Sequence, residues 1–575
     1  MIRLHPGRSC LAWLLVAIGL AVPQSQPVSQ EVPPPTIRVS TRLVLVDVVV
    51  TDKQGKPVPG LKAEDFTLEE KGKAQKIALF TPPQQAKQAS PPELAPGVYT
   101  NRSDFRAPGG PITAVLLDAA NTPFLDQAYA RDQMLKYVAQ QMKPGERMGI
   151  FALTTSLRVL QDFTSDPQVL LTALKNYKPS EQERTSAGPV PTSNMAGTSL
   201  RPGGDLLIGI AQEELRNFES AQIGYELDRR TEVTLDAMRS LGRILGGLPG
   251  RKSIVWLTAA FPFELVPENR TMTDEELMES LPNVKQKNVG TTSAGSLAST
   301  ERQGHAQQIR DVAFELSSAQ VAIYPVDVRG LISGMEGSAG HQAVAGSSPI
   351  ANISDVTASQ DTMREIASQT GGRAYVNQNE IRDGVAMVGA DNAASYTLGY
   401  YPADKKWDGK YRSLKVKVNH EGIETRYRQG YFAVDLSQEK DRKPEEEAAA
   451  GLRDGAPNTQ VTFSARVRPP SNGKLSVDFL VDANTLSSED ASGSKKLNMA
   501  IYAALFGRDG KLLTNRSQKV DQAFSADTYQ QILKQGMLMH LDVDAPADSS
   551  EVRLAVLDNR TGCVGTLRVL LAQLK

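Results

Sequence analysis

The stretch between residues 111 and 392 constrains the fold most, because short apolar runs alternate there with segments of helical spacing. The apolar runs are Ile112–Leu117, Met148–Leu153, Leu157–Leu160, Ser253–Thr258, Val321–Val326 and Arg373–Val376. A strand that is apolar on both faces is typical of the centre of a parallel sheet. Parallel strands need long crossover connections, which the helical segments provide. The pattern predicts an α/β domain over 111–392 with a doubly wound, mainly parallel sheet.

The regions on either side of this domain have β character. Residues 37–83 and 395–433 are each short for an independent sheet, so we expect them to pair with each other. Residues 459–575 contain many short alternating segments separated by turn signals, which predicts a β-sandwich-like C-terminal domain. The charged stretch 434–458 is interpreted as a linker, and the Pro-rich stretch 82–110 as a separator.

The N-terminus has the pattern of a secretory signal peptide over residues 1–26. Arg3 and Arg8 precede the apolar run Leu11–Val22, and the chain then becomes polar. The run is short for a membrane span, although an uncleaved anchor is the alternative interpretation. We therefore expect export to the periplasm or the exterior, with no transmembrane segment after signal removal.

Composition argues against several kinds of chemistry. The 64 basic and 65 acidic side chains nearly cancel, so nucleic acid is not an expected partner. The five histidines form no zinc-binding pair, and no Gly-x-Ser-x-Gly nucleophile motif occurs. We expect no catalytic residues, and the chain is predicted not to be an enzyme.

The strongest candidate site is Asp118-Ala-Ala-Asn-Thr122, which follows the first strand of the α/β domain. Ligands of open α/β sheets bind outside the carboxyl ends of the strands. Carboxylate and hydroxyl oxygens are also ligands that Mg²⁺ prefers. We expect Asp118, Asn121 and Thr122 to bind a protein partner at this edge.

A buried strand with this ending, and a later helix that runs into Thr370-Gly-Gly372 and a strand, resemble the von Willebrand factor A domain. More narrowly, the layout is similar to proteins with the VWFA-related Acidobacterial domain. Segments that carry this second resemblance are Arg42–Asp52, Leu61–Phe66, Pro249–Leu257 and Tyr396–Pro402.

The resemblance implies a metal site that this sequence only partly retains. The family pattern Asp-x-Ser-x-Ser places a hydroxyl where Ala120 stands, while Asp118 and Thr122 match. Thr231 or Thr234 would supply the threonine of a later loop. The family's last acidic residue falls in a segment that reads Leu257-Thr-Ala-Ala260 here. We therefore expect a degenerate site, no cofactor, and at most weak Mg²⁺ binding.

Three functions remain open at this stage. The leading hypothesis is an exported, non-enzymatic module that binds a protein partner at the strand-end edge. The second is a structural or assembly protein of the cell envelope with the α/β domain as a spacer. The third is a hydrolase with a site in 178–204 or 264–300, which the lack of a clustered acid, base and nucleophile argues against.

The signal-like N-terminus generates the first prediction. The mature protein should begin near residues 22–27, because the apolar run ends at Val22 and polar residues follow. N-terminal sequencing of the native protein checks this. A cytoplasmic protein that begins at Met1 would contradict it.

Overall fold

The computed structural model describes a defined set of residues. They are 43–83, 94–102, 111–178, 225, 228–248, 250–260, 308, 312, 315–317, 319–330, 349–434, 443–453, 457–491 and 493–574. The predicted signal peptide over 1–26 and the segments 179–204 and 264–300 lie outside these residues.

A five-stranded sheet forms the centre of the α/β domain, with the strand order β10-β9-β6-β7-β8. Its members are β6 (Ile112–Asp118), β7 (Arg147–Leu153), β8 (Leu157–Thr164), β9 (Lys252–Thr258) and β10 (Val321–Asp327). The first four strands of this order run parallel, whereas β8 pairs antiparallel with β7 at the edge. All residues of the four parallel strands are buried, as their continuous apolar runs predict.

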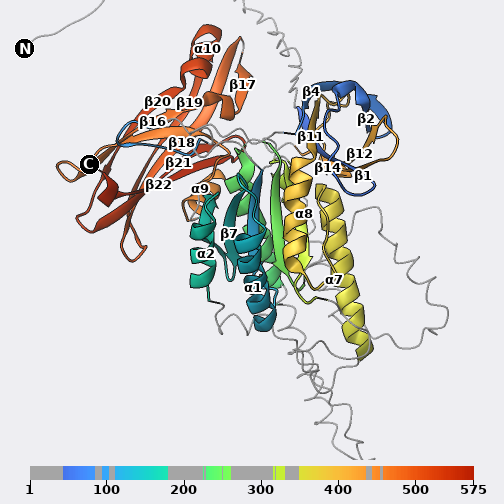
Figure 1. The fold of residues 1–575 in the computed structure, drawn as a ribbon. Helices are drawn as coiled ribbons and strands as arrows, with labels where there is room; N and C mark the ends of the chain where they lie inside the picture. Colours follow the sequence, from blue (N-terminus) through green and yellow to red (C-terminus); the bar gives the residue numbers. More distant parts are fainter. Residues whose placement is uncertain are drawn as a thin grey trace, which may run out of the picture. The chain divides into compact units, whose positions relative to one another are not determined.

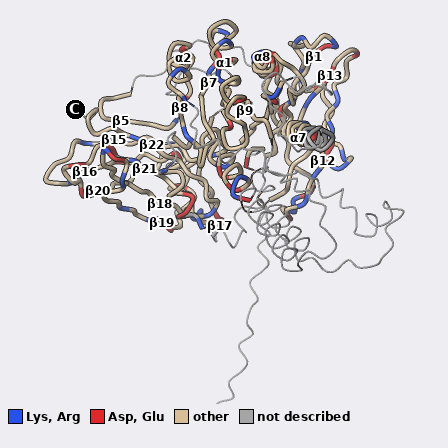
Figure 2. Tube along the Cα trace, turned by 90° about the horizontal axis from the view of Figure 1, so that it is seen from below, with Lys and Arg blue, Asp and Glu red and all other residues tan. Residues whose placement is uncertain are grey.

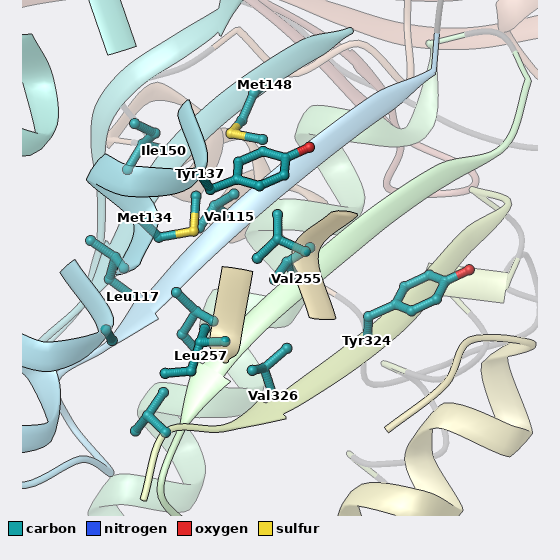
Figure 3. Packing of buried hydrophobic residues seen from close by; sticks show 14 of the residues in the cluster. Val115, Leu117, Met134, Tyr137, Met148, Ile150, Val255, Leu257, Tyr324 and Val326 are labelled. Carbon is teal, nitrogen blue, oxygen red and sulfur yellow. The ribbon is translucent and has the colours of Figure 1, made fainter. Parts of the chain in front are cut away.

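Helices cover both faces of this sheet. One face packs against α1 (Phe124–Gln140), α2 (Pro167–Asn176) and α8 (Ile381–Ala393), which lie along it in Figure 1. Figure 3 shows Met134 and Tyr137 of α1 beside Val115 of β6. The other face packs against the helix over 228–246 and α7 (Pro349–Thr370), through residues such as Leu241 and Ile366. The α/β class predicted from the alternating pattern is confirmed.

The predicted sixth strand, Arg373–Val376, is wrong as a strand. Only Tyr375 pairs with β10, in one parallel bridge to Val326. Gly372 precedes this bridge and lies so close to the Ile323 carbonyl that a side chain would collide with it. Asn377 follows with φ 57°, in the left-handed region, and turns the chain away from the sheet.

The two short β-rich segments combine into two shared sheets. Strands of the first segment are β1 (Val44–Asp52), β2 (Phe66–Glu70), β3 (Lys73–Gln75) and β4 (Ile77–Thr81). Strands of the second are β11 (Ser395–Tyr400), β12 (Tyr411–Val418), β13 (Ile423–Arg426) and β14 (Gly430–Phe432). The strand orders are β13-β1-β11-β4 and β14-β12-β2-β3, so each sheet contains both segments. Their inner residues form one apolar cluster that includes Val46, Leu68, Leu398 and Val416.

The C-terminal region also consists of two sheets around one apolar cluster. Its strands are β15 (Phe463–Val467), β16 (Lys474–Val481), β17 (Ser488–Ala491), β18 (Ser494–Gly507), β19 (Leu512–Ser525), β20 (Met537–Asp544), β21 (Ser549–Asp558) and β22 (Val564–Leu570). A helix, α10 (Ala526–Gln535), connects β19 to β20.

Two segments outside the predicted bounds 459–575 contribute to this region. The first is β5 (Val98–Thr100), which lies in the predicted separator 82–110 and pairs antiparallel with β15. The second is α9 (Pro444–Arg453), which lies in the predicted linker 434–458. Its Ala448 packs against Leu557 and Val564. Both segments supply contacts that the predicted boundaries leave out.

Charged residues of both signs are interspersed along the described chain (Figure 2), in agreement with the net charge of −1. Among the helices in the described part of the chain, none is long and apolar enough to cross a membrane.

The shared sheets generate a prediction that separates pairing from independent folding. Leu398→Ala in β11 removes a fully buried side chain and should cost about 2–5 kcal/mol of stability. Amide hydrogen exchange should rise in β1 as well as in β11, because β1 pairs with β11 along six residues. The half-exposed Leu480→Ala is the control. Unchanged exchange in β1 would contradict the shared sheet.

Candidate functional site

The candidate site lies at the point where the strand order of the central sheet reverses. The chain passes from β6 to β7 on one side, whereas β9 lies on the other side of β6. Ligands of open α/β sheets bind at such a switch point, outside the carboxyl ends of the strands. Asp118 ends β6 and Thr258 ends β9, so the segment 118–122 begins at this point.

The Asp118 carboxylate is buried and accepts hydrogen bonds from three donor groups. The backbone N–H of Asn121 donates to Oδ1 at 2.9 Å. The Asn121 side-chain amide donates to both carboxylate oxygens, at 3.2 and 3.0 Å. The indole N–H of Trp256 donates to Oδ2 at 2.9 Å from the neighbouring strand β9. Asp118 is only 2% exposed, so these protein donors replace the water that would otherwise solvate it.

Asn121 connects this carboxylate to the helix over 228–246. Its side-chain amide lies 3.1 Å from Thr234 Oγ1, and its Oδ1 accepts a hydrogen bond from Arg230 Nε at 3.0 Å. Thr234 in turn donates to the Arg230 carbonyl at 2.7 Å. One network therefore joins the end of β6, the end of β9 and this helix.

Burial raises the pKa of Asp118 above its ordinary value of 3.8, although the hydrogen bonds from Asn121 and Trp256 oppose the rise. An acid with a raised pKa in the folded state contributes stability that is fully present below its unfolded pKa. That contribution is lost as the pH rises through the folded pKa. The donors limit this loss because they stabilise the ionised carboxylate.

The other predicted metal ligands are also buried and engaged. Thr122 Oγ1 accepts a hydrogen bond from the Ala259 backbone N–H at 3.1 Å. Thr231 is buried on the same helix as Thr234, three residues before it. The structure thus brings Asp118, Asn121 and Thr234 into one network, while Thr122 contacts the end of β9.

This donor set does not fit the divalent cation that the resemblance implies. The N–H groups of Asn121 and Trp256 point at the carboxylate, where a cation would have to lie, and their positive ends would repel it. The side chains of Ala120 and Ala259 are buried beside the site and offer no oxygen. Within the described ranges, no three His, Cys, Asp or Glu side chains form a group that could hold a metal ion.

The structure buries Asp118, Asn121 and Thr122, the three residues that the sequence predicts to contact a partner. All three are at most 2% exposed, so a partner's surface cannot reach them in this structure. Exposed apolar surface lies just beyond them on α1, where Leu125 is 60% and Tyr129 36% exposed. The Tyr129 hydroxyl donates to the Asn379 carbonyl, which holds that ring at the start of the helix.

Two members of the network, Trp256 and Arg230, were not predicted from the sequence. In the sequence, Trp256 looks like an ordinary core residue of an apolar strand. Only the register between β6 and β9, in which Trp256 pairs with Leu116, places it beside Asp118. Arg230 lies one turn before Thr234, and that spacing is the only signal for it in the sequence.

A second strand end carries another satisfied carboxylate. Asp327 at the end of β10 accepts hydrogen bonds from the Arg329 backbone and guanidinium and from Gln360. The bond that Asp327 accepts from the Arg329 backbone N–H, at 3.0 Å, is a local side-chain-to-backbone contact typical of an aspartate at a strand end.

No family profile matches the sequence, and no curated protein matches it. Similar solved structures include an aerotolerance-related membrane protein from Bacteroides fragilis, with 13% identity, a TM-score of 0.24, and coverage of 49% of this chain and 99% of that chain. The conserved hypothetical protein BatB from Bacteroides thetaiotaomicron has 11% identity, a TM-score of 0.22, and coverage of 49% and 97%.

A von Willebrand factor type A protein from Catenulispora acidiphila is also among the similar structures. It has 8% identity and a TM-score of 0.20, and the match covers 93% of this chain and 73% of that chain. The strand order and the contacts of the chain itself, rather than these neighbours, define the fold and the site described above.

The network generates a prediction at Trp256. Trp256→Phe removes one donor from the buried Asp118 carboxylate and should destabilise the fold by about 1–3 kcal/mol near neutral pH. Without that donor the pKa of Asp118 should rise further, so the loss should be smaller at about pH 4.5, where more of the carboxyl group is protonated. Chemical denaturation at both pH values checks this. Equal losses at both would indicate a packing effect alone.

Proposed function

We propose that the chain is an exported, non-enzymatic protein-interaction module with a von Willebrand factor A-like domain whose strand-end site works without a metal ion. The observation that carries this proposal is the Asp118 carboxylate, whose oxygens accept from Asn121 and Trp256. A metal-dependent module would leave those oxygens directed at the ligand instead. The polar residues at the switch point, Asp118, Asn121 and Thr122, therefore act as an internal frame, which means that they hold neighbouring segments of the chain in place.

The recognition surface in this proposal is the start of α1. Leu125 and Tyr129 are four residues apart, so they lie on the same side of the helix, and both are exposed. The frame holds this surface in place, because the segment that enters α1 is bonded at Asp118, Asn121 and Thr122. Gln127 adds to the frame by donating to the Thr122 carbonyl at 2.7 Å.

Aromatic and large apolar side chains carry much of the binding energy at protein interfaces. An exposed pair of this kind beside a rigid frame supports a protein partner better than a small-molecule ligand. The signal-like N-terminus supports the exported location in which that partner would be met.

A pull-down from the native envelope fraction with mass spectrometry tests this proposal. Leu125→Asp should abolish capture of the partner, because it places a charge at the centre of the apolar surface, and it should leave thermal stability unchanged. Leu538→Asp is the matched control, since Leu538 is 74% exposed on β20 of the C-terminal region. Equal capture by the wild type and by Leu125→Asp would contradict the α1 surface. Loss with Leu538→Asp alone would favour a structural role for the C-terminal sheets.

A further inference from the structure

A small cavity of ≈20 Å³ lies where β1 and the segment after β13 meet the α/β domain. Three charged side chains line it: Asp47 of β1, Arg251 just before β9, and Arg428 just after β13. Both arginines are more than nine-tenths buried, with exposures of 8% and 9%. A cavity of this size holds one water molecule or one monatomic ion.

The two arginines are brought together by the end of α7. Arg251 donates to the Gly371 carbonyl at 2.6 Å. Gly371 has φ +75°, and a Cβ there would lie 2.8 Å from the Arg428 backbone nitrogen. Only glycine permits both this conformation and this close approach. The Thr-Gly-Gly sequence therefore places the two guanidinium groups at one cavity.

Each guanidinium is only partly satisfied by the protein. Arg251 donates through Nη2 to Tyr324 Oη and to the Gly371 carbonyl, and Arg428 donates through Nη2 to the Leu45 carbonyl. Neither Nε atom has a hydrogen-bond acceptor among the residues that the structure describes. Buried donors without an acceptor are costly, and native proteins usually supply one.

The charges around the cavity do not balance. Asp47 is the one carboxylate in the lining, and it accepts from the neutral donors Gln320 and Thr397. The next carboxylate, Asp391, is bonded by both terminal nitrogens of Arg426, at 2.7 and 2.5 Å.

Tyr324 connects Asp391 to Arg251. Its hydroxyl also donates to Asp391 at 3.1 Å, and Figure 3 shows that hydroxyl pointing away from Val255 and Val326. With Asp391 neutralised by Arg426, two lining cations face one carboxylate. Buried charges in proteins are normally compensated, so this excess calls for a negative charge.

We propose that this cavity is a binding site for a monatomic anion, chloride in solution, held between the guanidinium groups of Arg251 and Arg428. The anion accepts from donors that the protein leaves unused and neutralises the excess positive charge. The volume between the lining residues suits one monatomic ion, so sulfate and phosphate, with four oxygens each, are expected to bind less well. The bound anion stabilises the junction between the shared β sheets and the α/β domain.

Thermal unfolding of the full chain tests this site when sodium gluconate is replaced by sodium chloride at constant ionic strength. The melting temperature should rise with chloride, by about 1–3 °C at roughly ten times the dissociation constant, because the anion binds only the folded form. Bromide should act like chloride, and sulfate should not. Arg428→Gln should abolish the response. Arg468→Gln, an exposed arginine away from the cavity, should retain it.

The Asp47→Asn variant should strengthen the chloride response instead of abolishing it. It decides the question if Arg428→Gln does not fold. Removing the carboxylate that repels the anion should lower the chloride concentration needed for the same rise. A bromide-soaked crystal should show an anomalous peak between Arg251 and Arg428. The proposal is overturned by identical melting in chloride and gluconate, by a chloride response that Arg428→Gln retains in full, or by the absence of that peak.

Discussion

The buried Asp118 carboxylate is the interaction on which the strand-end edge of the α/β domain depends. An ionised carboxylate that leaves water must be compensated by hydrogen bonds, or its pKa rises until it is neutral. Asn121 and Trp256 provide those bonds, and Asn121 extends them to Thr234 and Arg230. Two strands and one helix are thus joined through a single carboxyl group, and the entry to α1 is held with them.

Much of the fold could be predicted because burial on both faces leaves a clear pattern. The runs that became β6, β7, β9 and β10 are apolar at nearly every position, so their place in the centre of a parallel sheet follows. The strand β5 could not be predicted from the sequence. Its three residues lie between prolines and are too few to show a periodic pattern of apolar and polar side chains. Only its partner β15, more than 350 residues later, makes it a strand.

The site could be located from the sequence but its chemistry could not. The end of a buried strand places Asp118, and the two alanines already argue against a complete metal site. Which groups surround the carboxylate depends on register, since Trp256 lies beside Asp118 only because it pairs with Leu116 of β6. The surroundings of Asn121 likewise depend on the helix over 228–246, more than 100 residues away, which supplies Thr234.

We propose that protein donors, and not a divalent cation, hold the Asp118 carboxylate. Thermal unfolding of the full chain with and without millimolar Mg²⁺ tests it most directly, because an ion that binds only the folded form raises the melting temperature. We expect no change in the wild type, and a measurable rise only after Ala120→Ser is combined with Ala259→Asp. A clear Mg²⁺-dependent rise in the wild type that Asp118→Ala abolishes would contradict it.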